Sequence, residues 1–232
     1  MPITWQINYL NLLSAVVAIA GVFQFLGTVY WAIESYPEPY HWETNFISDL
    51  GRLKTANGFD NSPTSNIFRI STAILGLSLV PFMLAMPEIF SKGRHLLRLL
   101  GLLSALGLFG IGQTPYDVYF GLHHIALAFW IVPMALMVVA IPVLLKLDGA
   151  APDALIALSI ALVGATVLYG CAGFHTGYVL MQKLVVLMSL LWLLVVTITV
   201  SIAAKYCKSD RQRLLAKQAD WYGKNLRRRS GT

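Results

Sequence analysis

Apolar residues gather into six long runs along the chain, separated by polar connections. A run of about 20 apolar residues is long enough to cross the hydrocarbon core of a bilayer as an α-helix. Backbone groups in lipid must bond within their own segment, so each run is expected to be helical. A membrane-spanning β-barrel would need alternating apolar and polar positions, which runs such as LVVLMSLLWLLVVTITV lack. The predicted spans are Tyr9–Ile33, Ile67–Phe90, Leu96–Ile111, Tyr119–Leu145, Ala154–Gly173 and Leu180–Ala204.

These spans predict an all-α, polytopic membrane protein. A bundle of six transmembrane helices takes up residues 1–204, with a long outer loop at 34–65, and a basic tail follows at 205–232. Within the loop, Trp42, Phe46 and Leu50 recur every four residues, as on one face of a helix. We therefore expect an interfacial helix over 42–52 that lies apolar side down on the membrane. Gly51 is expected to end it in a left-handed conformation.

Composition and charge agree with this class and give it an orientation. The chain is 57% hydrophobic and 12% charged, whereas a soluble domain is about 25% charged. Nine of its 17 Lys and Arg residues fall in the tail. Positive residues mark the cytoplasmic side, so both termini are expected in the cytoplasm, with the plasma (inner) membrane as the location. The net charge of +6 then serves orientation and contact with anionic lipids, and no nucleic-acid partner is predicted.

This orientation gathers most of the titratable chemistry on the outer side, including four of the five histidines. Asp117 and His124 are seven residues apart at the start of the fourth span, so they are expected to form a pair on one helix face. His123 would point about 100° away. The catalytic candidates, if there is a reaction, are His124 and Asp117. The predicted ligand-binding residues are Asn45, Ser48, Asp49, Asp117, His124 and His175.

The segment HWETNFISDLG (residues 41–51) is predicted to be the lid of this site. Asp49 would then lie close to the imidazole of His124 or His175. A plainer interpretation is also open, in which Asp49 forms a surface ion pair with Arg52 three residues on. In that interpretation Asn45 and Ser48 brace the loop through local hydrogen bonds.

The same side chains include types that bind metals. Asp117, His124 and His175 carry carboxylate and imidazole groups of the kind that hold a catalytic zinc. They lack the ligand spacing of a recognisable motif such as HExxH. No metal site is therefore predicted, these three residues are its only candidates, and no cofactor is assigned.

Three segments resemble a known group of proteins: FISDLG (46–51), NSPTSNIFRIS (61–71) and TPYDVYFGLHHIALAF (114–129). They are similar to a family of six-helix prokaryotic membrane proteins of unknown function, and more distantly to the eukaryotic DRAM/Sfk-like family. The resemblance spans about 31–197. It implies a six-helix architecture and an ISDxG motif in the first outer loop, with Ser48, Asp49, Gly51, Asp117 and His124 as matching positions. Some eukaryotic relatives are linked to lipid remodelling, which implies no defined reaction here.

Three functions fit these features. The first is binding of a membrane lipid headgroup, or of a small polar ligand, at the outer mouth of the bundle. The second is an intramembrane lipid hydrolase in which His124, with or without a metal, activates water while Asp117 orients it. The third is a transporter or an accessory subunit of a larger complex, and the accessory role would bring a membrane-protein partner. The nearly featureless inner halves of the spans count against a transporter. The accessory role leaves no specific mark in the sequence.

Overall fold

The computed structural model describes residues 3–90, 92–147, 151–171 and 177–229, and the side chains of 10–90, 92–147, 151–171 and 177–204. It consists of six long helices and two short 3-10 helices. In chain order these are α1 (Ile3–Glu34), η1 (Ile47–Gly51), α2 (Ser62–Ala85), η2 (Met86–Ile89), α3 (Arg94–Gln113), α4 (Phe120–Leu147), α5 (Asp153–Cys171) and α6 (Tyr178–Arg229).

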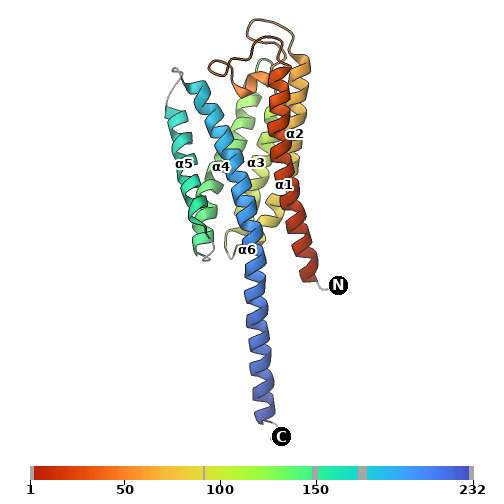
Figure 1. The fold of residues 1–232 in the computed structure, drawn as a ribbon, viewed down its shortest axis with the longest axis vertical. Coiled ribbons are helices and arrows are strands. Elements are labelled where there is room, and N and C mark those ends of the chain that lie inside the picture. The colour runs from red at the N-terminus through yellow and green to blue at the C-terminus, as the bar shows by residue number, and fades with distance from the viewer. Residues whose placement is uncertain (1–2, 91, 148–150, 172–176, 230–232) are drawn as a thin grey trace.

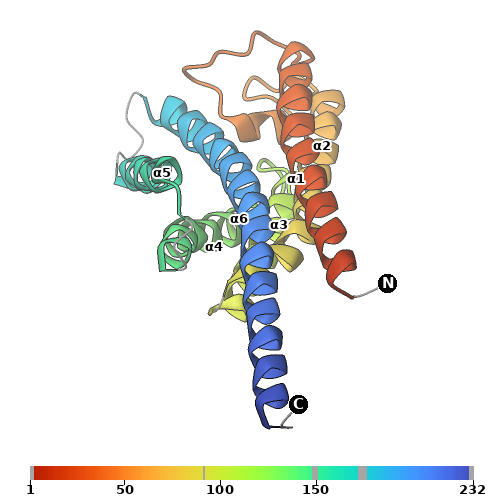
Figure 2. The same cartoon turned by 60° about the horizontal axis from the view of Figure 1, so that its bottom comes forward.

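The long helices run side by side along one axis (Figure 1). The first loop, residues 35–61, lies at one end of the bundle, which we call the loop end, and both chain termini lie at the opposite end. Helices α1 to α4 pack in sequence, each against the next, and α6 packs against α1 and α5. Helix α5 stands at the side of the bundle, next to α4 and α6 (Figures 1 and 2). The two termini therefore share one side of the bundle, as six crossings require.

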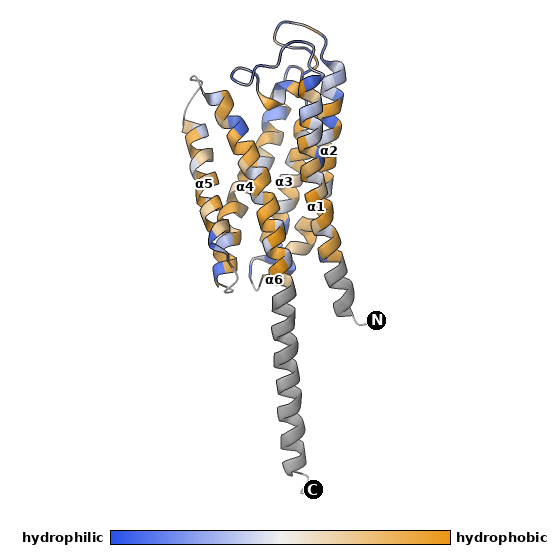
Figure 3. Ribbon diagram, viewed as in Figure 1, coloured by the Kyte–Doolittle hydropathy of each residue, from blue (hydrophilic) through white to orange (hydrophobic). Residues whose placement is uncertain are grey.

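All six long helices contain a stretch that is long and apolar enough to cross a membrane. Most residues along these helices are hydrophobic (Figure 3). Many of them point outward, and Phe23, Leu77, Leu106 and Ile160 are each at least 60% exposed. Apolar surface this extensive is typical of a protein that contacts lipid tails rather than water. The predicted fold class, an all-α bundle of six membrane-spanning helices, is confirmed, and the chain has the architecture of an integral membrane protein.

Helix α6 is much longer than a bilayer is thick. It has 52 residues, of which Tyr178–Ala204 form the apolar stretch. Residues 205–229, most of the predicted basic tail, continue the same helix beyond the bundle (Figure 1). The bundle and the tail are therefore joined by continuous helical backbone.

Glycines in α3 allow close helix packing, as small residues do in membrane bundles. A Cβ atom added to Gly107 would lie 2.3 Å from the backbone nitrogen of Trp130 in α4. A Cβ atom added to Gly76 in α2 would lie 2.7 Å from the carbonyl oxygen of Ala105 in α3. Both neighbours are backbone atoms, so no side-chain rotation could relieve the overlap.

Replacing Gly107 with alanine is therefore expected to push α3 and α4 apart. We expect the Gly107→Ala variant to lose about 1–3 kcal/mol of stability, the range for overpacking a tight core. The measurement is thermal unfolding of the purified protein in detergent. Gly164→Ala in α5 is the control, because a Cβ atom there has nothing within 4 Å. Equal melting temperatures for the two variants would contradict the close packing of α3 on α4.

The first loop contains a helix, but it differs from the expected one. Its helical part is the five-residue 3-10 helix η1, and residues 42–44 form a separate turn. The predicted apolar stripe is wrong, since Trp42 is 54% exposed whereas Leu50 is fully buried against the bundle core. Gly51 is not left-handed either; the left-handed glycines among the described residues are Gly58, Gly93 and Gly177. Gly51 instead packs beneath Phe68, where a Cβ atom would lie 2.7 Å from the ring. The helix is therefore held by the protein and not by the membrane surface.

Candidate functional site

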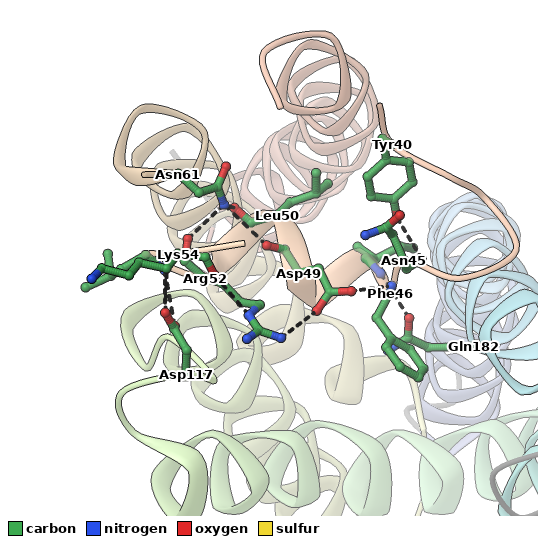
Figure 4. A network of polar contacts seen from close by, with 12 residues as sticks. Tyr40, Asn45, Phe46, Asp49, Leu50, Arg52, Lys54, Asn61, Asp117 and Gln182 are labelled. Carbon is green, nitrogen blue, oxygen red and sulfur yellow. Dashed lines mark hydrogen bonds and ion pairs between the residues drawn. The ribbon is translucent and has the colours of Figure 1, made fainter. Parts of the chain in front are cut away.

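The first loop folds over the loop end of the bundle, and residues 38–57 of it form what we call the roof. Asn61, fully buried at the N-terminus of α2, is bonded to the backbone of the roof (Figure 4). Its side-chain amide donates to the carbonyl oxygens of Arg52 at 2.8 Å and of Asp49 and Leu50 at 3.4 Å each. One buried side chain thus satisfies three carbonyl oxygens in and just after η1, which would otherwise be costly to bury.

Two further residues of α2 reinforce this attachment. The Ser65 hydroxyl donates to the carbonyl oxygen of Gly51 at 2.9 Å. The Thr64 hydroxyl donates to the carbonyl oxygen of Ser35, just after α1, at 2.7 Å. Residues 61–65 (NSPTS) therefore begin α2 and also hold the first loop in place by hydrogen bonds to its backbone.

Asp117 holds the roof from the connection between α3 and α4. Its carboxylate accepts hydrogen bonds from the backbone N–H groups of Leu53 and Lys54, at 3.0–3.1 Å (Figure 4). Asp117 was predicted to lie in the first turn of the fourth span and to pair with His124. That prediction is wrong, because α4 begins at Phe120 and Asp117 lies in the preceding turn. No hydrogen bond or ion pair joins Asp117 and His124 in the part of the chain that the structure describes.

Helix α6 holds the roof from the third side, through Lys183 and Gln182. The Lys183 side chain is only 4% exposed. Its ammonium group donates to the carbonyl oxygens of Trp42 at 2.8 Å and Asn45 at 2.5 Å. It also lies 5.7 Å from the ring centres of Tyr40 and Trp42, within the range of cation–π attraction.

Gln182 completes this attachment at the start of η1. Its side-chain oxygen accepts a hydrogen bond from the backbone N–H of Ile47 at 3.1 Å (Figure 4). Next to it, Tyr178 stacks on Tyr169 of α5 with ring centres 4.5 Å apart and meets Phe46 edge to face at 5.8 Å. The roof is therefore tied to α5 as well as to α6, through a row of three aromatic rings.

Asp49 lies at the inner edge of the roof and is mostly buried. It accepts a hydrogen bond from the backbone N–H of Phe46 at 2.7 Å and forms an ion pair with Arg52 at 3.6 Å. Burial raises the pKa of its carboxyl group, although the Phe46 hydrogen bond and Arg52 act in the opposite direction. Burial, followed by the negative charge of Asp49, raises the pKa of Tyr36 to about 12. Both shifts have the burial of the side chain as their largest cause.

Asp49 was expected to lie close to the imidazole of His124 or of His175. Among the described side chains, Asp49 has Phe46 and Arg52 as its partners, and no hydrogen bond or ion pair links it to His124. The Asp49–Arg52 pair is the one that the plainer interpretation predicted. His175 lies outside the described residues, so its proximity to Asp49 stays a prediction.

His123 and His124 lie at the start of α4 in an aromatic cluster with Tyr116 and Phe120. The Nδ1 atom of His124 is 2.8 Å from the carbonyl oxygen of Phe120, and that of His123 is 2.8 Å from the carbonyl oxygen of Thr114. A carbonyl oxygen only accepts, so each Nδ1 must carry the proton. In the neutral imidazoles Nε2 is then the acceptor.

A cavity of about 870 Å³ lies beneath the roof. Its upper wall carries most of its polar side chains, among them Asn45, Ser48, Asp49, Arg52 and His124, beside apolar ones such as Phe46 and Ile47. Its lower wall is formed by apolar side chains of the bundle interior, namely Phe25, Phe68, Leu75, Leu108, Ile111, Leu127, Trp130, Val186 and Leu190. The cavity is thus polar where it meets the loop and apolar where it enters the membrane-spanning part of the bundle.

The structure brings four of the six predicted binding residues to this cavity: Asn45, Ser48, Asp49 and His124. Asp117 serves instead as an attachment point of the roof. His175 lies outside the described residues. The described residues contain no group of three His, Cys, Asp or Glu side chains that could hold a metal, which leaves the part played by His175 untested.

Sequence reasoning missed the residues that hold the roof in place. Asn61, Gln182 and Lys183 were not among the predicted site residues. A signal was present for Lys183, because an ionisable residue inside a membrane span usually marks a functional or structural contact. Asn61 had only the weak signal of a helix-capping residue type before a Pro-containing first turn.

Comparisons of the chain with protein-family models, with curated proteins and with solved structures found no significant match. Its function must therefore be inferred from the roof and the cavity themselves.

Proposed function

We propose that this protein binds a membrane lipid, with the headgroup beneath the roof and the apolar part of the lipid in the cavity below. The observation that carries the proposal is the change from polar to apolar lining within one cavity of about 870 Å³. Ligand sites in proteins measure roughly 300–1,000 Å³. A small polar ligand would fill only the upper part and leave the apolar wall without a partner.

The upper wall offers groups that suit a headgroup. His124 presents an imidazole, Ser48 a hydroxyl and Arg52 a guanidinium to the same space. Such groups bind phosphate and ester oxygens by hydrogen bonds that are strengthened by charge. The resemblance to the DRAM/Sfk-like family, proposed from the ISDLG and TPYDVYFGLHHIALAF segments, agrees with a role in lipid handling.

The test is direct binding of phosphatidylethanolamine to the purified protein, measured by native mass spectrometry. We expect His124→Leu to weaken binding by a factor of roughly 10–100, since one charge-assisted hydrogen bond is worth roughly 1.5–3 kcal/mol. His95→Leu is the control, because His95 is exposed near the start of α3, away from the roof. Equal binding by both variants and the native protein would contradict a headgroup site at His124.

A lipid hydrolase is the second candidate, favoured by one observation. The hydrogen bond from His124 Nδ1 to Phe120 leaves Nε2 as an acceptor in the neutral ring, which is what a general base requires. In this case the Phe120 carbonyl, and not Asp117, orients the ring. Release of free fatty acid from the bound lipid, lost in His124→Leu and kept in His95→Leu, would favour this candidate.

We also propose that the loop end faces outward and both termini face the cytoplasm, in the plasma (inner) membrane. The support is the positive-inside rule applied to the tail. Single cysteines placed at Asn57 and at Ser209, in a chain with Cys171 and Cys207 changed to serine, test this in intact cells. We expect a membrane-impermeant maleimide to label the first and not the second. The reverse pattern would overturn the orientation.

A further inference from the structure

A second, smaller space adjoins the cavity under the roof. A smaller cleft of about 150 Å³ lies between α4, α5 and α6. Residues that line both spaces are Leu127, Trp130, Tyr169, Gln182 and Val186. Because these five belong to both walls, the cleft and the cavity adjoin along a common border.

The cleft is too small to be a ligand site of its own, since such sites are several hundred Å³. Its remaining lining is almost entirely apolar, with residues such as Met134, Val138, Leu162 and Val163. It reaches the lipid-facing surface at Val167, which is 56% exposed. Helix α5, which forms its outer wall, has the smallest buried share of the six spans, at 22%. We infer that the cleft is an apolar branch of the main cavity, since it adjoins that cavity on one side and the lipid-facing surface on the other.

Two apolar branches thus diverge beneath one polar roof. The main branch passes Leu75, Leu108 and Leu190 between α2, α3 and α6, and the side branch passes Leu162 and Val163 along α5. We propose that the ligand is a diacyl, ester-linked lipid that places one acyl chain in each branch. This inference rests on the proposed function and narrows it from lipids in general to lipids with two chains.

Trp130 stands where the branches divide and supplies the second observation. Its side chain is 9% exposed, and its indole N–H has no hydrogen-bond partner among the described residues. A buried donor without a partner is costly, by about the desolvation of that group. A ligand oxygen that accepts from this N–H would remove the cost.

The depth of Trp130 in the bundle suits an ester carbonyl. Trp130 is six residues after His124 on α4, about 9 Å further from the roof along the helix. Side chains on a helix lean toward its N-terminus, which for α4 is the loop end. The indole therefore lies between the polar roof and the apolar branches, at the level where a lipid joins its headgroup to its chains. We assign its N–H to an ester carbonyl oxygen of the lipid.

The first experiment compares dioleoyl phosphatidylethanolamine with its single-chain lyso form, by titration of the full-length protein in detergent. A headgroup with both charge signs suits a roof that carries Glu38, Asp49 and Arg52. We expect the diacyl form to bind about tenfold more tightly, because only its second chain fills the side branch. Ala135→Phe, which fills that branch, is expected to abolish the preference. Ala128→Phe, on the exposed face of the same helix, should retain it.

The second experiment stands even if Ala135→Phe fails to fold. It compares the diester lipid with the diether lipid of the same chains, which lacks the carbonyl oxygens. We expect the native protein to prefer the diester roughly threefold to tenfold, the value of one hydrogen bond. Trp130→Phe should remove this preference, whereas Trp31→Phe, at an exposed position on α1, should keep it.

The outcomes separate the two proposals. Equal binding of one-chain and two-chain lipids by the native protein would overturn the two-branch inference and leave lipid binding intact. A diester preference that survives Trp130→Phe would overturn the role of the indole. If neither lipid binds, the proposed function fails as well.

Discussion

The Asn61→Asp variant is expected to release the roof from the bundle. The substitution hardly changes the shape of the side chain, but it replaces an N–H donor by an oxygen that faces three carbonyl oxygens, those of Asp49, Leu50 and Arg52. Asn61 is fully buried, so the new carboxylate would have neither water nor a cation to stabilise it. Leaving a buried charge without a partner costs about 3–5 kcal/mol.

Hydrogen exchange of the backbone amides at residues 49–53 measures this effect. We expect exchange in the variant to be faster by two orders of magnitude or more, since 1.4 kcal/mol corresponds to a factor of ten. The control is Asn66→Asp, the same change at an exposed position one turn further along α2. Unchanged protection of η1 in the Asn61 variant would mean that Asn61 does not hold the roof.

Replacing Lys183 with methionine is the second change with a large expected effect. Methionine keeps much of the apolar stem but removes the ammonium group that bonds the carbonyl oxygens of Trp42 and Asn45. Hydrogen bonds to a charged group are worth about 1.5–3 kcal/mol each. We expect residues 41–46 to detach from α6 and lipid binding under the roof to fall by tenfold or more.

Lys54→Met provides the matched control, because Lys54 belongs to the same roof but its side chain is exposed. The two variants are compared by lipid titration and by protease cleavage within 41–46. Cleavage should accelerate only in the Lys183 variant. If both variants bind lipid like the native chain, the attachment of the roof to α6 has no role in binding.

The six helices could be predicted from the sequence because each depends on a local property. A run of about 20 apolar residues determines a membrane helix whatever its neighbours are. The structure accordingly places both ends of α3, α4 and α5 within two residues of their predicted positions, whereas α6 continues well past the predicted end of its span. Even the close approach of α3 to its neighbours follows from the local abundance of glycine.

The contacts of the loop could not be predicted in this way, because they depend on which distant groups come together. The spacing of Asp117 and His124 suggested a pair on one helix face. Pro115 instead leaves Asp117 in a turn before α4, where it meets a backbone 64 positions earlier in the chain. The partners of Lys183, the carbonyl oxygens of Trp42 and Asn45, lie about 140 positions away in the sequence. The spacing of apolar and polar residues along the chain does not indicate contacts between residues so far apart in the sequence.

For the segment predicted to be a lid, the sequence indicated its position but not the contacts that hold it. The segment at 41–51 does cover the bundle, and Asn45, Ser48 and Asp49 do line the cavity with His124. Its attachment was misjudged, since the apolar residue Leu50 is buried in protein and not in lipid. A sequence pattern shows that a residue needs an apolar environment but not which environment supplies it.

The attachment of the roof to α6 has a mechanical consequence. Gln182 and Lys183 are on the same helix as residues 205–229, and that helix of 52 residues is roughly 80 Å long at 1.5 Å per residue. One continuous helical backbone thus joins the segment beyond the bundle to the two side chains that hold residues 42–47. We expect a torque or pull applied near Arg229 to act on these contacts at the opposite end of the bundle.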